Sequence, residues 1–106
     1  MRTRRASPSD LAAVAAISRA QPRSAGWAPG QFEEELASPR TLFHVLDDGV
    51  VRGYAVFKLV APEAQLVDLA VDPSALRRGL GRTLLEESFV LLRQEGFHRA
   101  TLEVSR

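Results

Sequence analysis

The sequence predicts an α/β (α+β) fold in which one mixed sheet carries helices. Three observations support this class. Stretches rich in β-branched and aromatic residues follow one another closely between residues 41 and 71, which predicts an antiparallel meander. Amphipathic segments with helical periodicity stand before and after the meander. The segment 65–104 reads strand, glycine-containing loop, helix, strand, an order that normally forms a right-handed crossover between parallel strands.

The N-terminal part predicts one strand and two helices. Residues 1–6 are expected to form the first strand. Ser7-Pro8-Ser9-Asp10 predicts a helix start, because serine caps helices, proline suits the first helical position and the acid stands where a capping box needs it. This helix is expected to end near Ala20. Residues 21–30 contain two prolines and two glycines and predict a loop, and residues 32–36 predict a second short helix.

The rest of the chain predicts four strands and one long helix. Asp47-Asp48-Gly49 predicts a hairpin turn in which the glycine can take positive φ. A stripe of leucines at helical spacing predicts the long helix, and Gly96 suits its C-terminal end. The expected strands cover residues 41–46, 50–60, 65–71 and 98–104, and the expected helix covers residues 79–95.

The composition fits one domain, residues 1–106, and excludes several kinds of site. Hydrophobic residues make up 45% of the chain and charged residues 25%, as in an ordinary globular protein. The chain has no cysteine, which excludes disulfides and thiolate chemistry. His44 and His98 have no ligand partner at metal spacing, so no metal site is expected. A net charge of +1 and the lack of a long apolar run favour neither nucleic acid nor membrane, and we expect a cytoplasmic location.

The segment from Val71 to Arg82, which joins a strand to a helix, is the most informative part of the sequence. Gly79 and Gly81 let backbone N–H groups approach a ligand closely. The helix N-terminus adds unpaired donors and a partial positive charge, and Arg77, Arg78 and Arg82 add full charges. The pattern predicts a site for a phosphate or pyrophosphate. Because Gly-x-Gly turns are common, the alternative is an ordinary solvated loop.

This segment and its surroundings resemble the coenzyme A motif of GNAT acetyltransferases. The matching stretches run from Gln65 to Pro73 and from Arg77 to Glu86. Leu102-Glu103-Val104, and Trp27 with Phe32, are similar to patterns of the ribosomal-protein-alanine acetyltransferase (RimI) subgroup. The resemblance covers essentially the whole chain and implies a GNAT-like mixed sheet. Since the family pattern continues past Leu-Glu-Val, it also implies that the C-terminal part of the domain is lacking.

The resemblance implies an N-acetyltransferase that uses acetyl-CoA and acts on a peptide or small-molecule amine, such as a protein N-terminus. The strand ending near Val71 and the strand beginning near Thr101 would then separate to admit the pantetheine arm. The Val71 amide N–H would polarise the thioester, and Leu76, where the family has Gln or Arg, would weaken phosphate binding. The implied cofactor-binding residues are Leu69, Ala70, Val71, Arg77, Arg78, Gly79, Leu80, Gly81 and Arg82.

Glu103 is the general base that the resemblance implies, because it is the glutamate of Leu-Glu-Val. The family's general acid has no counterpart, and the only tyrosine, Tyr54, is interpreted as a packing residue. Asp68 either lines the acceptor side or faces solvent. The alternatives to an active enzyme are a catalytically inactive module that binds coenzyme A or a protein, or a truncated fragment. The exposed C-terminal edge would also allow a homodimer.

Overall fold

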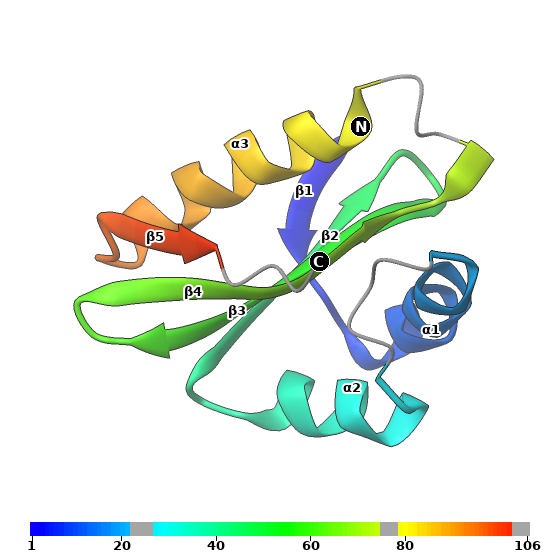
Figure 1. Ribbon diagram of the computed structural model, residues 1–106. Coiled ribbons are helices and arrows are strands. Elements are labelled where there is room, and N and C mark those ends of the chain that lie inside the picture. Colours follow the sequence, from blue (N-terminus) through cyan, green and yellow to red (C-terminus); the bar gives the residue numbers. More distant parts are fainter. Residues whose placement is uncertain (22–26, 75–78, 103–106) are drawn as a thin grey trace.

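Five strands form one mixed sheet in the computed structural model, which describes residues 1–21, 27–74 and 79–102. The strands are β1 (Arg2–Arg5), β2 (Thr41–Asp47), β3 (Val51–Val60), β4 (Glu63–Val71) and β5 (Arg99–Leu102). They lie side by side in chain order (Figure 1). Pairing is antiparallel from β1 to β4 and parallel between β4 and β5, which confirms the predicted meander and crossover.

Helices cover both faces of the sheet. α1 (Leu11–Ala20), which follows a 3-10 turn over Pro8–Asp10, and α2 (Pro29–Ala37) lie on one face. α3 (Leu80–Gln94) lies on the other face and forms the crossover between the two parallel strands (Figure 1). The site-bearing connection from β4 to α3 is thereby anchored at both ends by packed elements.

Two predicted boundaries were wrong. α2 begins at Pro29, inside the stretch predicted as a loop, because proline at the first helical position has a preset φ and Gln31 Oε1 accepts the Ala28 N–H at 3.0 Å. β4 begins at Glu63, where a turn was expected, because Val60 and Glu63 already pair across the hairpin. Residues 22–26 of the predicted loop and 103–104 of the predicted last strand lie outside the described residues.

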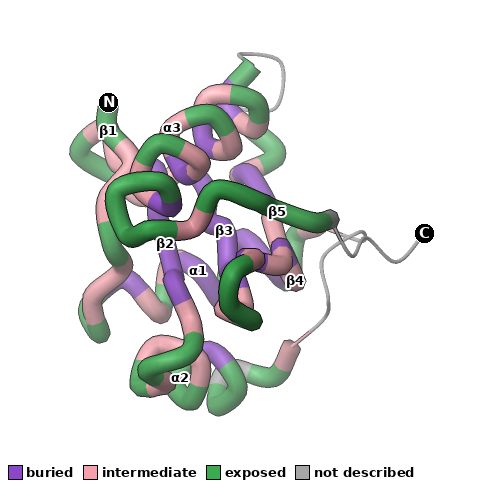
Figure 2. The backbone as a smooth tube through the Cα atoms, turned by 90° about the vertical axis from the view of Figure 1, so that its left-hand side faces the viewer, coloured by how far each residue is buried: buried purple, intermediate pink, exposed green. Residues whose placement is uncertain are grey.

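Alternating side chains of the central strands contribute to two separate cores. On β3, Ala55 and Phe57 face α3, whereas Tyr54 and Val56 face α1 and α2. In Figure 2 the buried residues lie in the central strands and on the helix sides that face them, whereas the described side chains of β5 are exposed. The buried α3 residues are Leu80, Leu84, Ser88 and Leu92.

A bulge at Val67 reverses the facing of the side chains along β4. The register between β3 and β4 skips this one residue. Leu66, before the bulge, packs in the core beneath α3. Asp68, after it, accepts a hydrogen bond from Tyr54 in the opposite core. In a regular strand Asp68 would share the face of Leu66, so the bulge is what turns this carboxylate toward α1 and α2.

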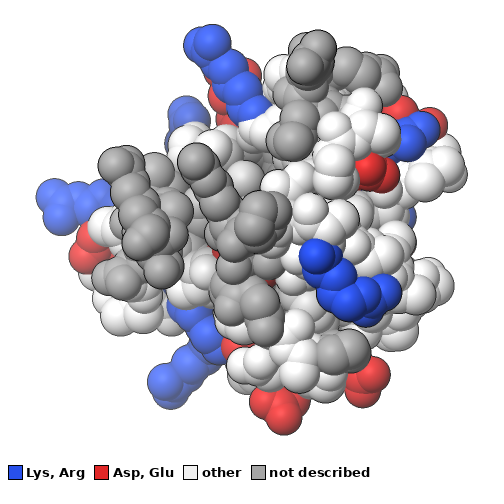
Figure 3. Space-filling view, turned by 45° about the vertical axis from the view of Figure 1, so that its right-hand side comes forward, with Lys and Arg blue, Asp and Glu red and all other residues white. Residues whose placement is uncertain are grey.

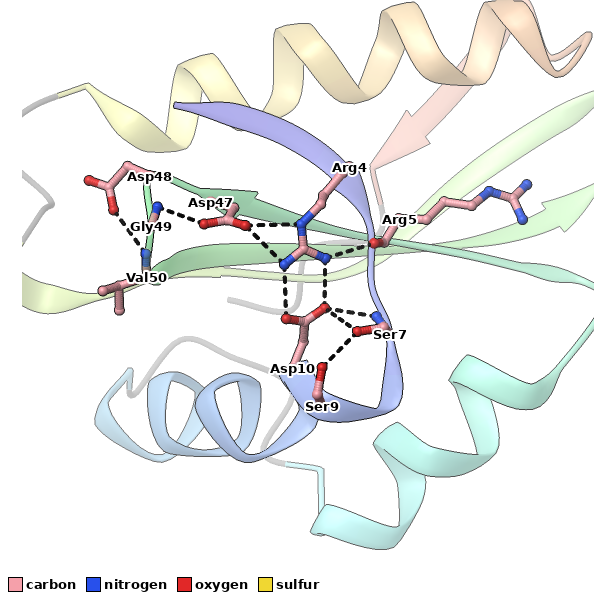
Figure 4. Close-up of polar contacts among 9 residues, drawn as sticks. All are labelled: Arg4, Arg5, Ser7, Ser9, Asp10, Asp47, Asp48, Gly49 and Val50. Carbon is pink, nitrogen blue, oxygen red and sulfur yellow. Dashed lines mark hydrogen bonds and ion pairs between the residues drawn. The ribbon is translucent and has the colours of Figure 1, made fainter.

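Arg4 joins β1 to β2 and to the start of α1 (Figure 4). Its guanidinium donates to the two carboxylate oxygens of Asp10, at 2.8 and 3.0 Å, and to Asp47 at 3.0 Å. Asp10 also accepts the Ser7 backbone N–H at 2.8 Å, which confirms its predicted capping role. Hydrogen bonds from Arg4 outweigh burial and, together with those from Ser7, lower the pKa of Asp10 to about 2. The pair thus stays ionised throughout the neutral range.

His44 lies on β2 beneath α3, fully enclosed in the protein. Its Nδ1 is 3.0 Å from the Oγ of Ser88, which is also buried, so the pair ties α3 to the sheet. Burial lowers the pKa of His44 to about 4, and the nearby charge of Arg5 acts in the same direction. Glu95 opposes them weakly. The neutral form of this imidazole is therefore the one that suits the folded state.

Acidification is expected to destabilise the fold through His44. Because its pKa falls from 6.5 to about 4 on folding, the unfolded state binds the proton first. The contribution of neutral His44 to stability should therefore be present in full above about pH 6.5. The free energy of unfolding should fall by about 2 kcal/mol between pH 7 and pH 5. Urea unfolding at the two pH values measures this change. His44→Gln keeps a polar group for Ser88 but has no titratable ring, so its free energies of unfolding at pH 7 and pH 5 should differ much less.

The pH range of the effect distinguishes the contribution of His44 to stability from that of Asp10. The pKa of Asp10 is lowered from 3.8 to about 2, so its contribution to stability is present above about pH 4 and disappears only as the pH falls toward 2. An unchanged pH dependence in the His44→Gln variant between pH 7 and pH 5 would contradict the assignment to this histidine.

Candidate functional site

The candidate site lies where β4 ends and α3 begins. Of the residues predicted from the sequence, Leu69, Ala70 and Val71 are the last three of β4, Gly79 directly precedes α3, and Leu80, Gly81 and Arg82 form the first turn of α3. Arg77, Arg78 and Glu103 lie outside the described residues. The described part of the site thus consists of a strand end and a helix N-terminus, as predicted.

Within the part of the chain that the structure describes, β4 has an open edge at its C-terminal end. Among the described residues its pairing with β5 covers Glu63 to Leu66 and does not reach Val71. The last strand was expected over residues 98–104, and β5 begins at Arg99, within one residue of that position, because Gly96, with a φ of 93°, reverses the chain directly after α3. Thr101, near which the resemblance implies that the two strands separate, is still paired with Gln65. A separation of the two strands can therefore lie only beyond Leu66.

The direction of the peptide groups determines what this edge offers. The Asp72 N–H donates to the Arg52 carbonyl at 2.7 Å, so this pair is hydrogen-bonded across to β3. By the alternation of an antiparallel ladder, the peptide groups of Ala70 face β3, and those of Leu69 and Val71 face the open edge. Only Leu69 and Val71 can therefore bind an extended ligand as an added strand; Ala70, predicted alongside them, cannot do so through its backbone.

Two glycines flank the buried side chain of Val71, but only one of them is required by packing. A Cβ on Gly53 would lie 3.0 Å from the Ala70 carbonyl oxygen and 3.3 Å from Val71 Cγ2, so β3 has no room for a side chain there. A Cβ on Gly81 would meet only Val71 Cγ2, at an ordinary 3.6 Å. Packing thus requires glycine at Gly53, which the sequence reasoning missed, but not at Gly81, where glycine leaves space beside the helix.

The first turn of α3 presents backbone donors to that space. Gly79 has a left-handed φ of 70°, and its carbonyl accepts the Thr83 N–H at 3.2 Å. The N–H groups of Leu80, Gly81 and Arg82 precede this bond and have no partner within the helix. They give the helix N-terminus its partial positive charge. The Arg82 side chain is 84% exposed and lies only loosely against Glu86, at 3.7 Å, so it can turn toward an anion.

A buried polar pair lies on the face of β4 beneath α1 and α2. The Tyr54 hydroxyl donates to Asp68 Oδ2 at 2.7 Å, and both residues are buried. The Tyr54 ring meets Phe32 edge-on, with centroids 5.5 Å apart. Tyr54 therefore packs in the core as predicted. The option that Asp68 faces solvent was wrong, because the bulge turns its carboxylate inward.

Gln21, which directly follows α1, also contacts the site. Its Nε2 donates to the Val71 carbonyl oxygen at 2.6 Å. Gln21 is in turn held by a hydrogen bond from its backbone N–H to the Ser18 carbonyl at 3.2 Å. The sequence reasoning placed Gln21 in a loop and assigned it no role, since no local pattern connects it with the distant end of β4.

The charged surface and the helices show little that suggests other ligands. On the face seen in Figure 3, the described lysine and arginine side chains stand apart and do not form a continuous stripe. No group of three or more histidine, aspartate or glutamate side chains suited to a metal occurs among the described residues. None of the described helices has the length and apolar character that crossing a membrane would require.

Comparison with known proteins gives consistent matches. Residues 11–106 match the model of the acetyltransferase (GNAT) family. The ribosomal protein bS18-alanine N-acetyltransferase of Escherichia coli K12 is 33% identical over 78 residues, which make up 74% of this chain and 53% of that protein. The chain therefore spans about half the length of the relatives that it matches.

Solved structures agree with the sequence matches. The crystal structure of the Escherichia coli ribosomal-protein-S18-alanine N-acetyltransferase superposes with a TM-score of 0.74 at 30% identity, over 89% of this chain and 60% of that one. A GNAT family acetyltransferase from Brucella melitensis, solved in complex with acetyl-CoA, has a TM-score of 0.78 at 22% identity, over 98% of this chain and 75% of that one. At that identity the second likeness concerns the fold alone.

Proposed function

The chain belongs to the acetyltransferase (GNAT) family, and on this premise we propose that it moves an acetyl group from acetyl-CoA to an amine. The open edge of β4 beside the N-terminus of α3 is the observation that carries the proposal. An edge with free peptide groups suits the amide-containing pantetheine arm. A helix N-terminus with unpaired donors suits the pyrophosphate.

The described residues fit this ligand in both of its parts. The Leu69 N–H and C=O and the Val71 N–H face the open edge, which gives an extended amide both donors and an acceptor. Gly81 leaves room for a ligand at the first turn of α3, although internal packing does not require a glycine at this position. Arg77 and Arg78, which precede Gly79 in the sequence, would add positive charge. In this role the Val71 N–H would bind the acyl oxygen as negative charge develops on it.

The transfer itself needs few groups from the protein. The acceptor amine attacks the thioester carbonyl carbon, the carbon–sulfur bond breaks with its electron pair staying on sulfur, and coenzyme A leaves as a thiolate that takes up a proton. The proton lost by the amine must be removed. We assign that proton to Glu103, directly or through water, as the general base. No cysteine or serine nucleophile is required, which agrees with a chain that has no cysteine.

For the acceptor, we propose a peptide N-terminus. The support is the 33% identity with an enzyme named for the alanine of ribosomal protein bS18. A small-molecule amine is the other class to test. The cytoplasmic location and a homodimer through the edge of β5 stay predictions from the sequence.

Calorimetric titration of the chain with acetyl-CoA tests the cofactor part. Arg77→Ala combined with Arg78→Ala is expected to weaken binding by about tenfold, at about 0.7 kcal/mol for each exposed charge–phosphate contact. The matched control is Arg93→Ala with Arg99→Ala, which changes the net charge equally at two exposed arginines, one in the last turn of α3 and one at the start of β5. Absence of binding by the unaltered chain would overturn the proposed cofactor.

A further inference from the structure

The two polar groups of Val71 at the open edge have opposite effects on an acyl oxygen. The N–H and C=O of one strand residue point to the same side, so both lie on the edge that faces away from β3. An N–H there stabilises negative charge, whereas a carbonyl oxygen close to it repels the same charge. An edge that ends in an unbound Val71 carbonyl would therefore weaken what the Val71 N–H provides.

Gln21 binds that carbonyl. The 2.6 Å bond from its Nε2 joins the C-terminal end of α1 to the end of β4. The next peptide group is fixed as well, because the Asp72 N–H donates to Arg52 at 2.7 Å. The peptide between Val71 and Asp72 is thus hydrogen-bonded at both ends and cannot rotate to present its oxygen elsewhere.

From this geometry, and resting on the proposed function, we propose that Gln21 is a positioning residue that makes the edge selective for acetyl-CoA over free coenzyme A. By occupying the Val71 carbonyl, Gln21 leaves the Val71 N–H as the polar group of that residue for which the described residues provide no partner, and an N–H pairs with an acyl oxygen. Free coenzyme A has a thiol where acetyl-CoA has a thioester, so it lacks the acyl oxygen, and its S–H is a weak hydrogen-bond donor. It would bind better to a free carbonyl than to the edge as Gln21 leaves it.

The proposal gives Gln21 a role that packing alone would not. If Gln21 only stabilised the end of β4, its replacement would lower the affinity for acetyl-CoA and for coenzyme A equally, because both ligands make the same pantetheine and phosphate contacts. A residue that controls the Val71 carbonyl changes the ratio of the two affinities. That ratio can be measured without an acceptor and without turnover.

The test is calorimetric titration of coenzyme A and of acetyl-CoA into the full chain and two variants. Gln21→Met keeps the length of the side chain and removes the donor; Gln21→Glu replaces the donor by an acceptor. We expect the preference for acetyl-CoA over coenzyme A to fall about fivefold in each, which is the usual size of one hydrogen bond. Gln31→Glu is the matched control, since Gln31 uses its Oε1 as an acceptor in α2, and it should leave the preference unchanged.

The outcomes are distinguishable. An unchanged ratio in both Gln21 variants would overturn this proposal and leave the proposed function intact, whether or not the two affinities fell together. If the unaltered chain bound neither ligand, the proposed function would fail and this inference with it. Circular dichroism of each variant, compared with the unaltered chain, confirms that the titrated protein is folded.

Discussion

Replacement of Gly81 by glutamate is expected to weaken acetyl-CoA binding by about 100-fold without loss of stability. A carboxylate about 5 Å from a phosphate, at an effective dielectric constant of about 20, is repelled by about 3 kcal/mol, which corresponds to this factor. The fold has room for the change, because a Cβ at Gly81 meets only Val71, at 3.6 Å. Glycine to glutamate in the first turn of a helix should instead stabilise the chain slightly, through backbone entropy and the helix dipole.

The control is Val90→Glu, which adds the same charge to the same helix. Val90 is 50% exposed and lies in the second half of α3, away from its N-terminus. Its variant should bind acetyl-CoA as the unaltered chain does. Calorimetry measures both affinities, and thermal unfolding followed by circular dichroism measures both stabilities. Equal binding by the two variants would contradict the placement of the phosphates at the start of α3.

The sequence was sufficient for the parts of the fold that local patterns specify. The leucine stripe predicted α3 to within one residue at each end, Gly49 takes the positive φ expected of it, and Gly96 stands at the C-terminal end of α3 as expected. The sequence was also sufficient to place the helix half of the candidate site, because the glycine pair at the start of α3, Gly79 and Gly81, is visible in a single sequence. The comparisons then agreed with the family that these motifs resemble.

What the sequence could not predict depends on register and on contacts between distant segments. The bulge at Val67 is a property of the pairing between β3 and β4, and nothing in the residue itself indicates it. The sequence left open whether Asp68 lines the acceptor side or faces solvent, and the bulge decides that its side chain is buried. The contacts of Gly53 and Gln21 with the end of β4 were missed for the same reason, because each joins residues that only the folded chain brings together.

Replacement of Tyr54 by alanine is expected to lower the free energy of unfolding by about 4 kcal/mol, the usual cost of removing a buried aromatic ring. The ring is fully buried and contacts both Phe32 and Phe43, so its loss leaves a cavity in the core beneath α1 and α2. A domain of this size is stable by about 5–15 kcal/mol, so the variant should lose about a quarter or more of its stability and unfold at a clearly lower urea concentration. Urea unfolding followed by circular dichroism gives the difference.

Tyr54→Phe separates the two contributions of this residue. It keeps the ring and removes only the hydroxyl that donates to Asp68 at 2.7 Å, so it should cost about 1–3 kcal/mol, the price of taking a donor from a buried carboxylate. The remainder, seen only in Tyr54→Ala, is then the contribution of packing. Because Asp68 directly precedes Leu69 on β4, loss of the hydroxyl should also loosen the strand that presents the open edge. Equal costs for the two variants would contradict this division and would mean that the hydrogen bond, rather than the ring, holds this core together.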